Sequence, residues 1–207
     1  MINMWYYNDS WHISTRSSIG ANCKWFSNKK FYELFQESNS LNFEAMNKNY
    51  FYSFVLQHPE NRIVTCYSEP KITLVFVGKV NDDNTVESMP YEDIANDINV
   101  YTPLRYEFEI NNSIEGLIDY VSKKNYEFQG LVLKNGIHRT KIRNPNYNYA
   151  RQLRGNTRNM KYLYYDLLKT GKMDEYLNFY PEFTQLFNFF SSEFSEMAKN
   201  LHISYMN

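Results

Sequence analysis

The sequence is poor in glycine, cysteine and long apolar runs, and each shortage excludes a class of protein. Its 207 residues include only 7 Gly, none of them clustered, which excludes phosphate loops of the Walker or Rossmann type. Two Cys provide neither a disulfide framework nor a zinc pattern, and they indicate a reducing compartment. No stretch approaches the ~20 apolar residues of a membrane span, and the N-terminus lacks the pattern of a secretory signal. We therefore expect a cytoplasmic protein with no membrane partner.

Apolar and aromatic residues are abundant instead. Hydrophobic residues make up 43% of the chain, which is enough for a packed core. Aromatic residues make up 18%, and the chain contains 26 Asn. Asn, Lys, Tyr, Ile and Phe have AT-rich codons, so this composition is typical of an AT-rich genome. The aromatic content therefore does not by itself indicate a stacking surface.

The net charge of −1 hides two segments of opposite sign. Residues 82–120 contain ten acids against Arg105 alone, and residues 134–172 contain ten bases against Asp166 alone. Five of the ten bases are Arg, whose guanidinium group can contact a phosphate through two hydrogen bonds. The basic segment predicts phosphate binding. Two alternatives remain, a solvated helix face and pairing with the acidic segment.

Turn signals and alternating apolar residues predict an α+β body over residues 1–144. The expected strands are 3–8, 11–16, 50–56, 63–67, 72–77, 106–110, 130–133 and 137–142. Helical segments are expected at 29–36, 41–47, 90–98 and 113–124. The turns Asp9-Ser10 and Asn135-Gly136 predict two hairpins.

The remaining residues, 145–207, predict a helical C-terminal segment. Gly171 is expected to end one helix, and Pro181 is expected to begin the last one. Apolar residues with helical spacing run along that last helix, and we expect them to pack in a core: Phe183, Leu186, Phe187, Phe190, Phe194, Met197 and Leu201. The sequence thus predicts two parts, 1–144 and 145–207.

Three local strings resemble the nucleotidyltransferase domain of phage- and virus-type ATP-dependent RNA ligases. They are Trp11-His-Ile-Ser-Thr-Arg16, the aromatic stretch 51–64, and Phe128-Gln-Gly-Leu-Val-Leu133 followed by Arg139-Thr-Lys-Ile-Arg143. The resemblance covers residues 1–150 and implies an antiparallel-sheet nucleotidyltransferase-like body. It also implies ATP with a divalent metal as cofactor, RNA or nucleotide as partner, and a viral origin, which the composition favours as well.

The resemblance assigns roles to five residues. Arg16 lies in the string that follows the nucleophilic lysine in such ligases, and Phe54 lies in the aromatic strand that flanks the nucleobase. Gln129 stands in the E-G-x-V motif, while Lys141 and Arg143 form the K-x-K-like motif that holds phosphates. For Phe54 the alternative is a core aromatic on a central strand. For Lys141 and Arg143 the alternative is the exposed end of a strand.

The departures from the family pattern concern the chemistry. In such ligases a lysine of a K-x-D/E-G motif attacks the α-phosphate of ATP, but the first lysine here is Lys24, beyond the expected place. Glu is replaced by Val55 in the aromatic strand and by Gln129 in the E-G-x-V motif, and the change from carboxylate to amide removes a charge that would help to bind a metal or hold a ribose hydroxyl. We therefore expect a degenerate or truncated ligase-like protein with no catalytic residue, which binds nucleotide or RNA without adenylating itself.

Further arginines predict a track for RNA. Arg139 precedes the K-x-K-like motif, and Arg151, Arg154 and Arg158 follow at spacings of three and four, which places them on one helix face. Solvation of that helix is the alternative. The four His are scattered without the spacing of metal ligands, so no metal site is predicted.

Two other functions stay open. One is a non-catalytic protein-interaction module in which the basic segment meets an acidic surface. The other is one part of a split, active RNA ligase whose lysine comes from a separate polypeptide.

Overall fold

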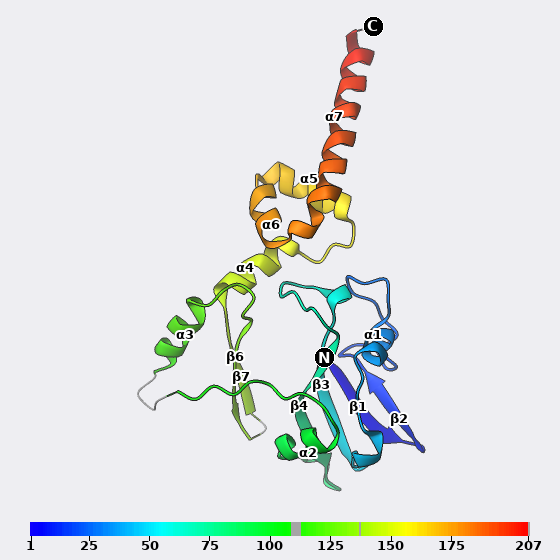
Figure 1. Ribbon diagram of the computed structural model, residues 1–207, viewed down its shortest axis with the longest axis vertical. Coiled ribbons are helices and arrows are strands. Elements are labelled where there is room, and N and C mark those ends of the chain that lie inside the picture. The colour runs from blue at the N-terminus through cyan, green and yellow to red at the C-terminus, as the bar shows by residue number, and fades with distance from the viewer. Residues whose placement is uncertain (109–112, 137, 207) are drawn as a thin grey trace.

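Two antiparallel sheets form the first part of the chain, as Figure 1 shows for the computed structural model, which describes residues 1–108, 113–136 and 138–206. The larger sheet has the strand order β2-β1-β3-β4-β5. Its strands are β1 (Ile2–Tyr7), β2 (Ser10–Ser14), β3 (Tyr50–Gln57), β4 (Lys71–Val80) and β5 (Val86–Ser88). The second sheet is the hairpin of β6 (Gly130–Asn135) and β7 (His138–Arg143). The expected α+β class with antiparallel sheets is therefore confirmed.

Local sequence explains both predicted hairpins. Asn8 and Asp9 have φ of 45° and 58°, the left-handed conformation that a two-residue turn between β1 and β2 requires. The turn thus lies one residue earlier than the expected Asp9-Ser10. The hairpin of β6 and β7 forms around Gly136, which has φ of 59°, and Asn135 is paired with His138, so this turn begins one residue later than the expected Asn135-Gly136. Both predicted hairpins are confirmed.

One face of the larger sheet is buried beneath two short helices. The side chains of Ile2, Met4, Tyr52, Phe54 and Leu74 point to this face and are at most 2% exposed. The helices α1 (Phe31–Glu37) and α2 (Tyr91–Asp97) add buried residues to the same cluster. Helix α1 begins later than the expected residue 29, because the Glu33 carboxylate accepts a hydrogen bond from the backbone of Lys30 and fixes the N-cap there. Short 3-10 helices lie at Phe43–Ala45 and Pro59–Asn61.

A third helix, α3 (Ile114–Ser122), covers one face of the β6–β7 hairpin. The Ser113 hydroxyl accepts a hydrogen bond from the Gly116 backbone at 3.2 Å, which is the predicted N-cap. Leu117 and Val121 of this helix pack against Leu131 of β6. The opposite face of the hairpin is therefore left free of α3.

Four helices form the C-terminal segment. They are α4 (Pro145–Arg154), α5 (Met160–Thr170), α6 (Met173–Phe179) and α7 (Thr184–Met206). Gly171 ends α5 in the left-handed conformation, as predicted, whereas Pro181 begins a 3-10 turn, Pro181–Phe183, that precedes α7. No helix in the described part of the chain is long and apolar enough to cross a membrane.

The apolar stripe of α7 is only half buried, which corrects the expectation that it packs in a core. Phe187 and Phe190 are 2% and 9% exposed, in a cluster with Leu163, Tyr164 and Leu167 of α5. The helix then projects past its neighbours, as Figure 1 shows, and Met197 and Leu201 are 59% and 73% exposed. Helical spacing gives the direction of a side chain, but burial also requires a neighbouring element.

Two predicted strands are wrong. The segment 63–67 is irregular because it packs against the helical segment: Val64 is buried beside Tyr147, and the Tyr180 hydroxyl donates a hydrogen bond to the Ile63 carbonyl at 3.0 Å. Residues 106–108 of the expected strand 106–110 are irregular as well, and the rest lies outside the described residues. The expected division after residue 144 stays a prediction.

Candidate phosphate-binding cleft

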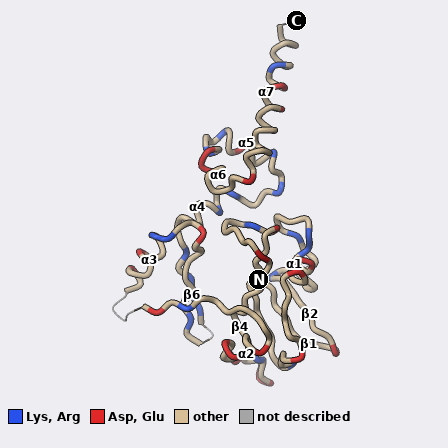
Figure 2. The backbone as a smooth tube through the Cα atoms, viewed as in Figure 1, with Lys and Arg blue, Asp and Glu red and all other residues tan. Residues whose placement is uncertain are grey.

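Four basic side chains share one face of the β6–β7 hairpin. Lys134 pairs directly with Arg139, Val132 with Lys141, and Gly130 with Arg143. Because side chains alternate along a strand and directly paired residues point the same way, Lys134, Arg139, Lys141 and Arg143 lie on the same face. The other face carries Leu131 and Ile142 and packs against α3. We call the first face the basic hairpin face, and Figure 2 shows Lys and Arg in blue along this hairpin.

The basic hairpin face turns toward the larger sheet. Lys134 Nζ donates hydrogen bonds to the Val75 carbonyl of β4 at 2.7 Å and to the Tyr91 hydroxyl at 3.2 Å, and it lies 4.5 Å from the centroid of the Tyr91 ring. A cavity of about 390 Å³ adjoins this contact. Its lining residues include Phe76 of β4, the three bases Arg105, Lys134 and Arg139, and one acid, Glu92. Lys134 therefore holds the tip of the hairpin beside the sheet.

The other end of the hairpin approaches the start of β1. Burial, and then the positive charge of Lys141, lowers the pKa of the Met1 amino group. An effect of this kind requires the two cations to lie close together. Lys141 is thus near enough for its charge to act on the residue that precedes β1. We call the cavity between the basic hairpin face and β4 of the larger sheet the inter-sheet cleft.

The larger sheet has a second face, away from the core helices, and Phe76 of β4 on this face lines the inter-sheet cleft. Along β1 and β3, Asn3, Trp5, Ser53 and Val55 alternate with the buried residues of the core face and are half-buried or, for Ser53, 7% exposed. The Ser53 hydroxyl donates a hydrogen bond to Asn3 Oδ1 at 2.9 Å across the two strands. This face offers neutral polar groups and rings rather than charges.

Phe54, the residue predicted to flank a nucleobase, lies on the core face. Its side chain is 0% exposed, with ring centroids of Phe35 and Tyr52 at 6.2 Å and 6.3 Å. This is the alternative position, a core aromatic on a central strand, and it leaves no ring surface for a base. The neighbouring Val55 lies on the second face of the sheet instead, because consecutive residues of a strand face opposite sides.

The structure places the other predicted nucleotide-binding residues separately. Lys141 and Arg143 lie together on the basic hairpin face. Gln129 precedes that strand, is exposed, and donates from its amide to the Tyr67 hydroxyl at 3.3 Å. Arg16 is exposed in the turn after β2, and among the described residues no hydrogen bond or ion pair joins it to the hairpin. Only the pair from the K-x-K-like motif is thus brought together.

The predicted RNA track along one helix face is wrong. Helix α4 ends at Arg154, because Gly155 follows it with φ of 61°, so Arg158 does not share that helix. Arg154 is 6% exposed, its guanidinium carbon lies 4.1 Å from the centroid of the Phe26 ring, and the guanidinium group of Arg158 donates to the Lys24 carbonyl. Both side chains therefore join the helical segment to the loop after β2. Arg139 and Arg151 remain exposed.

Sequence reasoning missed Lys134 as a member of the site. Part of the signal was present, because alternation along two paired strands places Lys134 on the side of Arg139 and Lys141, whereas the pairing of Lys134 with Arg139 depends on the observed register. It also missed Arg62, which joins the two parts of the chain. The Arg62 guanidinium donates to both carboxylate oxygens of Glu182 at 2.6 Å and to the Phe179 carbonyl at 2.8 Å.

A cluster of metal-ligand type lies away from the cleft. Glu37, His58 and Glu60 place one ligand atom each within 4.8 Å of one another. The Lys29 ammonium group already binds both carboxylates, at 2.8 Å from Glu37 and 2.7 Å from Glu60, and these hydrogen bonds raise the pKa of Lys29 to about 12. A lysine therefore supplies the positive charge in this cluster, and we do not assign it to a metal.

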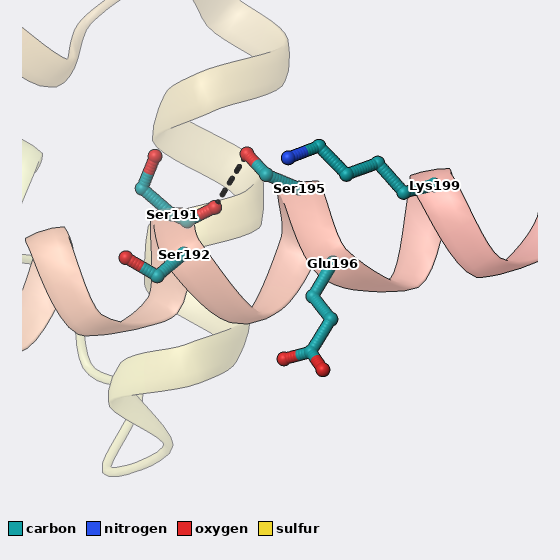
Figure 3. Close-up of a pocket in the computed structure, with 5 residues that line it drawn as sticks. All are labelled: Ser191, Ser192, Ser195, Glu196 and Lys199. Atoms are coloured by element: carbon teal, nitrogen blue, oxygen red, sulfur yellow. Dashed lines mark hydrogen bonds between the residues drawn. The ribbon is translucent and has the colours of Figure 1, made fainter.

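A shallow depression on α7 has no features of a binding site. Figure 3 shows its lining residues, which all come from that one helix: Ser191, Ser192, Ser195, Glu196 and Lys199. The hydroxyl groups of Ser192 and Ser195 donate back to the helix carbonyls of Asn188 and Ser191 at 3.1 Å and 2.9 Å. These hydrogen bonds stay within α7, so the serine hydroxyls are not arranged around a ligand. The inter-sheet cleft is therefore the better candidate site.

Comparison with known proteins gives one relevant similarity. No family model matches the chain. The chain is 33% identical over 91 residues to a protein described as "RNA ligase" of Rhodothermus phage RM378. The match covers 38% of this chain and 21% of the phage protein, so the chain spans about a fifth of the length of that relative. An RNA ligase-like relationship is therefore supported for part of the chain.

Proposed function

We propose that this chain is an RNA ligase-like protein that binds the phosphates of a nucleotide or an RNA strand in the inter-sheet cleft. The observation that carries the proposal is the basic hairpin face, where four cations share one side of the hairpin and two of them, Lys134 and Arg139, line a cavity beside β4. The partial identity to a phage RNA ligase supports the same assignment, and two antiparallel sheets around a cleft suit a nucleotidyltransferase-like fold.

Within the described part of the chain, the acidic segment does not neutralise the bases of the hairpin by direct ion pairs. Among the described residues no ion pair within 4 Å joins bases of 134–172 to acids of 82–120. Glu92 pairs with Arg105, and Lys134 acts on Glu92 only as a weaker, more distant charge. The alternative explanation of the basic segment, pairing with the acidic one, therefore loses its support.

ATP suits the cleft better than a metal does. Lys141 can act as a point charge on a phosphate, while Arg143 can donate two parallel hydrogen bonds. Val55 and Gln129 stand where the resemblance implies carboxylates, and an alkyl group or an amide cannot supply the anionic oxygen that a divalent metal prefers. We derive no metal-assisted step from this site.

We also propose binding without formation of a covalent adduct. The first lysine of the 207 residues, Lys24, has its backbone carbonyl bonded by Arg158 of the helical segment. Its backbone is thus held at the helical segment and not beside Lys141. Self-adenylation requires an amine fixed next to the α-phosphate. Lys24, whose backbone carbonyl is bonded to the helical segment, does not meet this requirement.

Labelled ATP tests the proposal in one experiment with two readouts. Equilibrium dialysis is expected to show binding that Lys141→Ala and Arg143→Ala each weaken about tenfold, since a hydrogen bond to a charged group contributes ~1.5–3 kcal/mol. The matched control is Lys169→Ala, an exposed lysine near the end of α5. On a denaturing gel the label is expected to be released. Equal binding by all variants, or a stable AMP band, would overturn the proposal.

One observation favours a second function, a protein-interaction module. The exposed part of the α7 stripe presents Met197, Leu201 and Tyr205, which are 59%, 73% and 87% exposed. Side chains of this type, aligned along one helix, are typical of a surface that docks on another protein. Capture of a partner that is unaffected by salt and by Lys141→Ala would favour this function over phosphate binding.

A further inference from the structure

Aromatic rings form a row across the uncovered face of the larger sheet. His12 of β2 is paired with Trp5 of β1, and Trp5 is paired with Phe51 of β3. The rings of Trp5 and His12 lie nearly parallel, with centroids 5.8 Å apart, and Phe51 and Phe76 of β4 have centroids 5.7 Å apart. The aromatic row, Trp5, His12, Phe51 and Phe76, thus crosses four adjacent strands.

The absence of a side chain at Gly78 keeps part of the row in place. Gly78 is paired with Phe51, and a Cβ atom there would lie 2.5 Å from Phe51 Cζ and 2.7 Å from Phe76 Cε1. Its φ lies outside the left-handed region that favours glycine, so the backbone alone does not explain this residue. The two rings lie across the strand over Gly78, and the glycine makes room for them.

The row lies on the face away from the core helices. Its four rings are half-buried, whereas Met4 and Tyr52, their neighbours in sequence, are buried beneath the helices. Tyr7, next along β1 on the same face, is 62% exposed. Sheet faces in water usually carry polar side chains. A sheet face that carries this many aromatic rings indicates contact with a partner that has flat apolar surfaces.

The charge at one end of the row identifies the partner. Phe76 lines the same cavity as Lys134 and Arg139, so the row ends at the basic hairpin face. We propose that the aromatic row is a stacking platform for the unpaired bases of a single-stranded nucleic acid, whose phosphates lie against the basic hairpin face. This inference rests on the proposed function for the position of the phosphates.

The dimensions and the chemistry fit a single strand. Four strands span about 14 Å at ~4.8 Å per spacing, which is enough for about three or four nucleotides. Every base offers a flat face, so stacking tolerates any sequence. In a duplex the base faces are covered by neighbouring pairs, and such a strand cannot stack on the row. The inference therefore includes a preference for single strands over duplexes.

The test uses fluorescence anisotropy with a labelled eight-nucleotide RNA and its duplex form. Trp5→Leu is expected to weaken binding of the single strand about tenfold, because each base stacked on an aromatic ring contributes substantially to the affinity. Trp5→Phe, which keeps a ring, and Trp25→Leu, a tryptophan outside the sheet, are expected to stay within about threefold of the unaltered chain. Phe51→Leu provides a second variant of the row, and circular dichroism monitors folding of each.

The outcomes separate this inference from the proposed function. If Lys141→Ala loses the RNA while folded Trp5→Leu and Phe51→Leu bind it as well as the unaltered chain, the stacking platform is overturned and the phosphate site stands. If Lys141→Ala binds normally, the proposed function is overturned. Equal affinity for the duplex, or no RNA binding by the unaltered chain, also overturns the stacking platform.

Discussion

Gly130 holds a position between β6 and β7 that no other residue type fits. Its φ is 132°, and a Cβ atom would lie 2.1 Å from the Ile142 carbonyl oxygen and 2.9 Å from the Cα atom of Arg143. The backbone of β7 therefore occupies the space that a side chain at residue 130 would need. This single glycine sets where Arg143 stands on the basic hairpin face.

Gly130→Ala is expected to destabilise the fold more than Gly136→Ala does. Gly136 also has a positive φ, of 59°, but its added Cβ would meet nothing within 4 Å. A left-handed alanine costs ~1–2 kcal/mol in either variant, and the backbone clash at residue 130 adds a further ~1–3 kcal/mol. Urea unfolding measures both variants. Equal losses would show that the hairpin relaxes around the added methyl group.

At the scale of elements, short contacts between distant segments join the helical segment to the body. Arg62 bonds Glu182 and the Phe179 carbonyl, and Tyr180 donates to the carbonyls of Ile63 and Ala150, each at 3.0 Å. The buried rings of Tyr176 and Tyr180 lie at the centre of this junction, with centroids 4.8 Å apart. The irregular segment 62–64 thus acts as a connector rather than as the strand that its composition suggested.

These two tyrosines predict a loss of stability at alkaline pH. Burial raises the pKa of both hydroxyl groups in the folded chain, so the unfolded chain releases their protons first, from its ordinary value near 10. Their contribution is complete below pH 10 and falls as pH rises further. At pH 11 the loss is about 1.4 kcal/mol for each tyrosine that stays protonated in the fold.

Urea unfolding at pH 8 and pH 11 checks this expectation with one variant. In Tyr176→Phe the ionisable hydroxyl is absent, so its loss of stability between the two pH values is expected to be smaller by about 1.4 kcal/mol. The same variant removes a buried hydroxyl oxygen that has no hydrogen-bond partner among the described residues, and at pH 8 it is expected to be no less stable. If Tyr176→Phe lost as much stability between pH 8 and pH 11 as the unaltered chain, ionisation of Tyr176 would not be the cause of the alkaline loss.

At the scale of the whole molecule, sequence reasoning predicted local features well and contacts between segments poorly. The two hairpins, the cap of α3 at Ser113 and the end of α5 at Gly171 depend on neighbouring residues, and all four are confirmed. The shared helix face of Arg151, Arg154 and Arg158 failed because Gly155 ends α4 early. The side to which Phe54 points depends on which face of β3 the helices cover, and that is a tertiary property.

The same distinction applies to the candidate site. Lys141 and Arg143 share a face by strand alternation, so a strand over these residues is enough to bring them together, and their role in binding phosphates stays a prediction. The second face of the larger sheet was not predictable, because it is built from strands that are more than 50 residues distant along the chain. The aromatic row likewise appears only when the register of β1, β2, β3 and β4 is known.

The salt dependence of RNA binding tests the central claim, phosphate binding by the basic hairpin face, most directly. For a single strand the slope of log K against log salt is about −0.7 for each phosphate neutralised, so four cations predict a slope near −2.8. The double variant Lys141→Ala/Arg143→Ala is expected to reduce the slope by about 1.4. A slope that the double variant leaves unchanged would contradict the account.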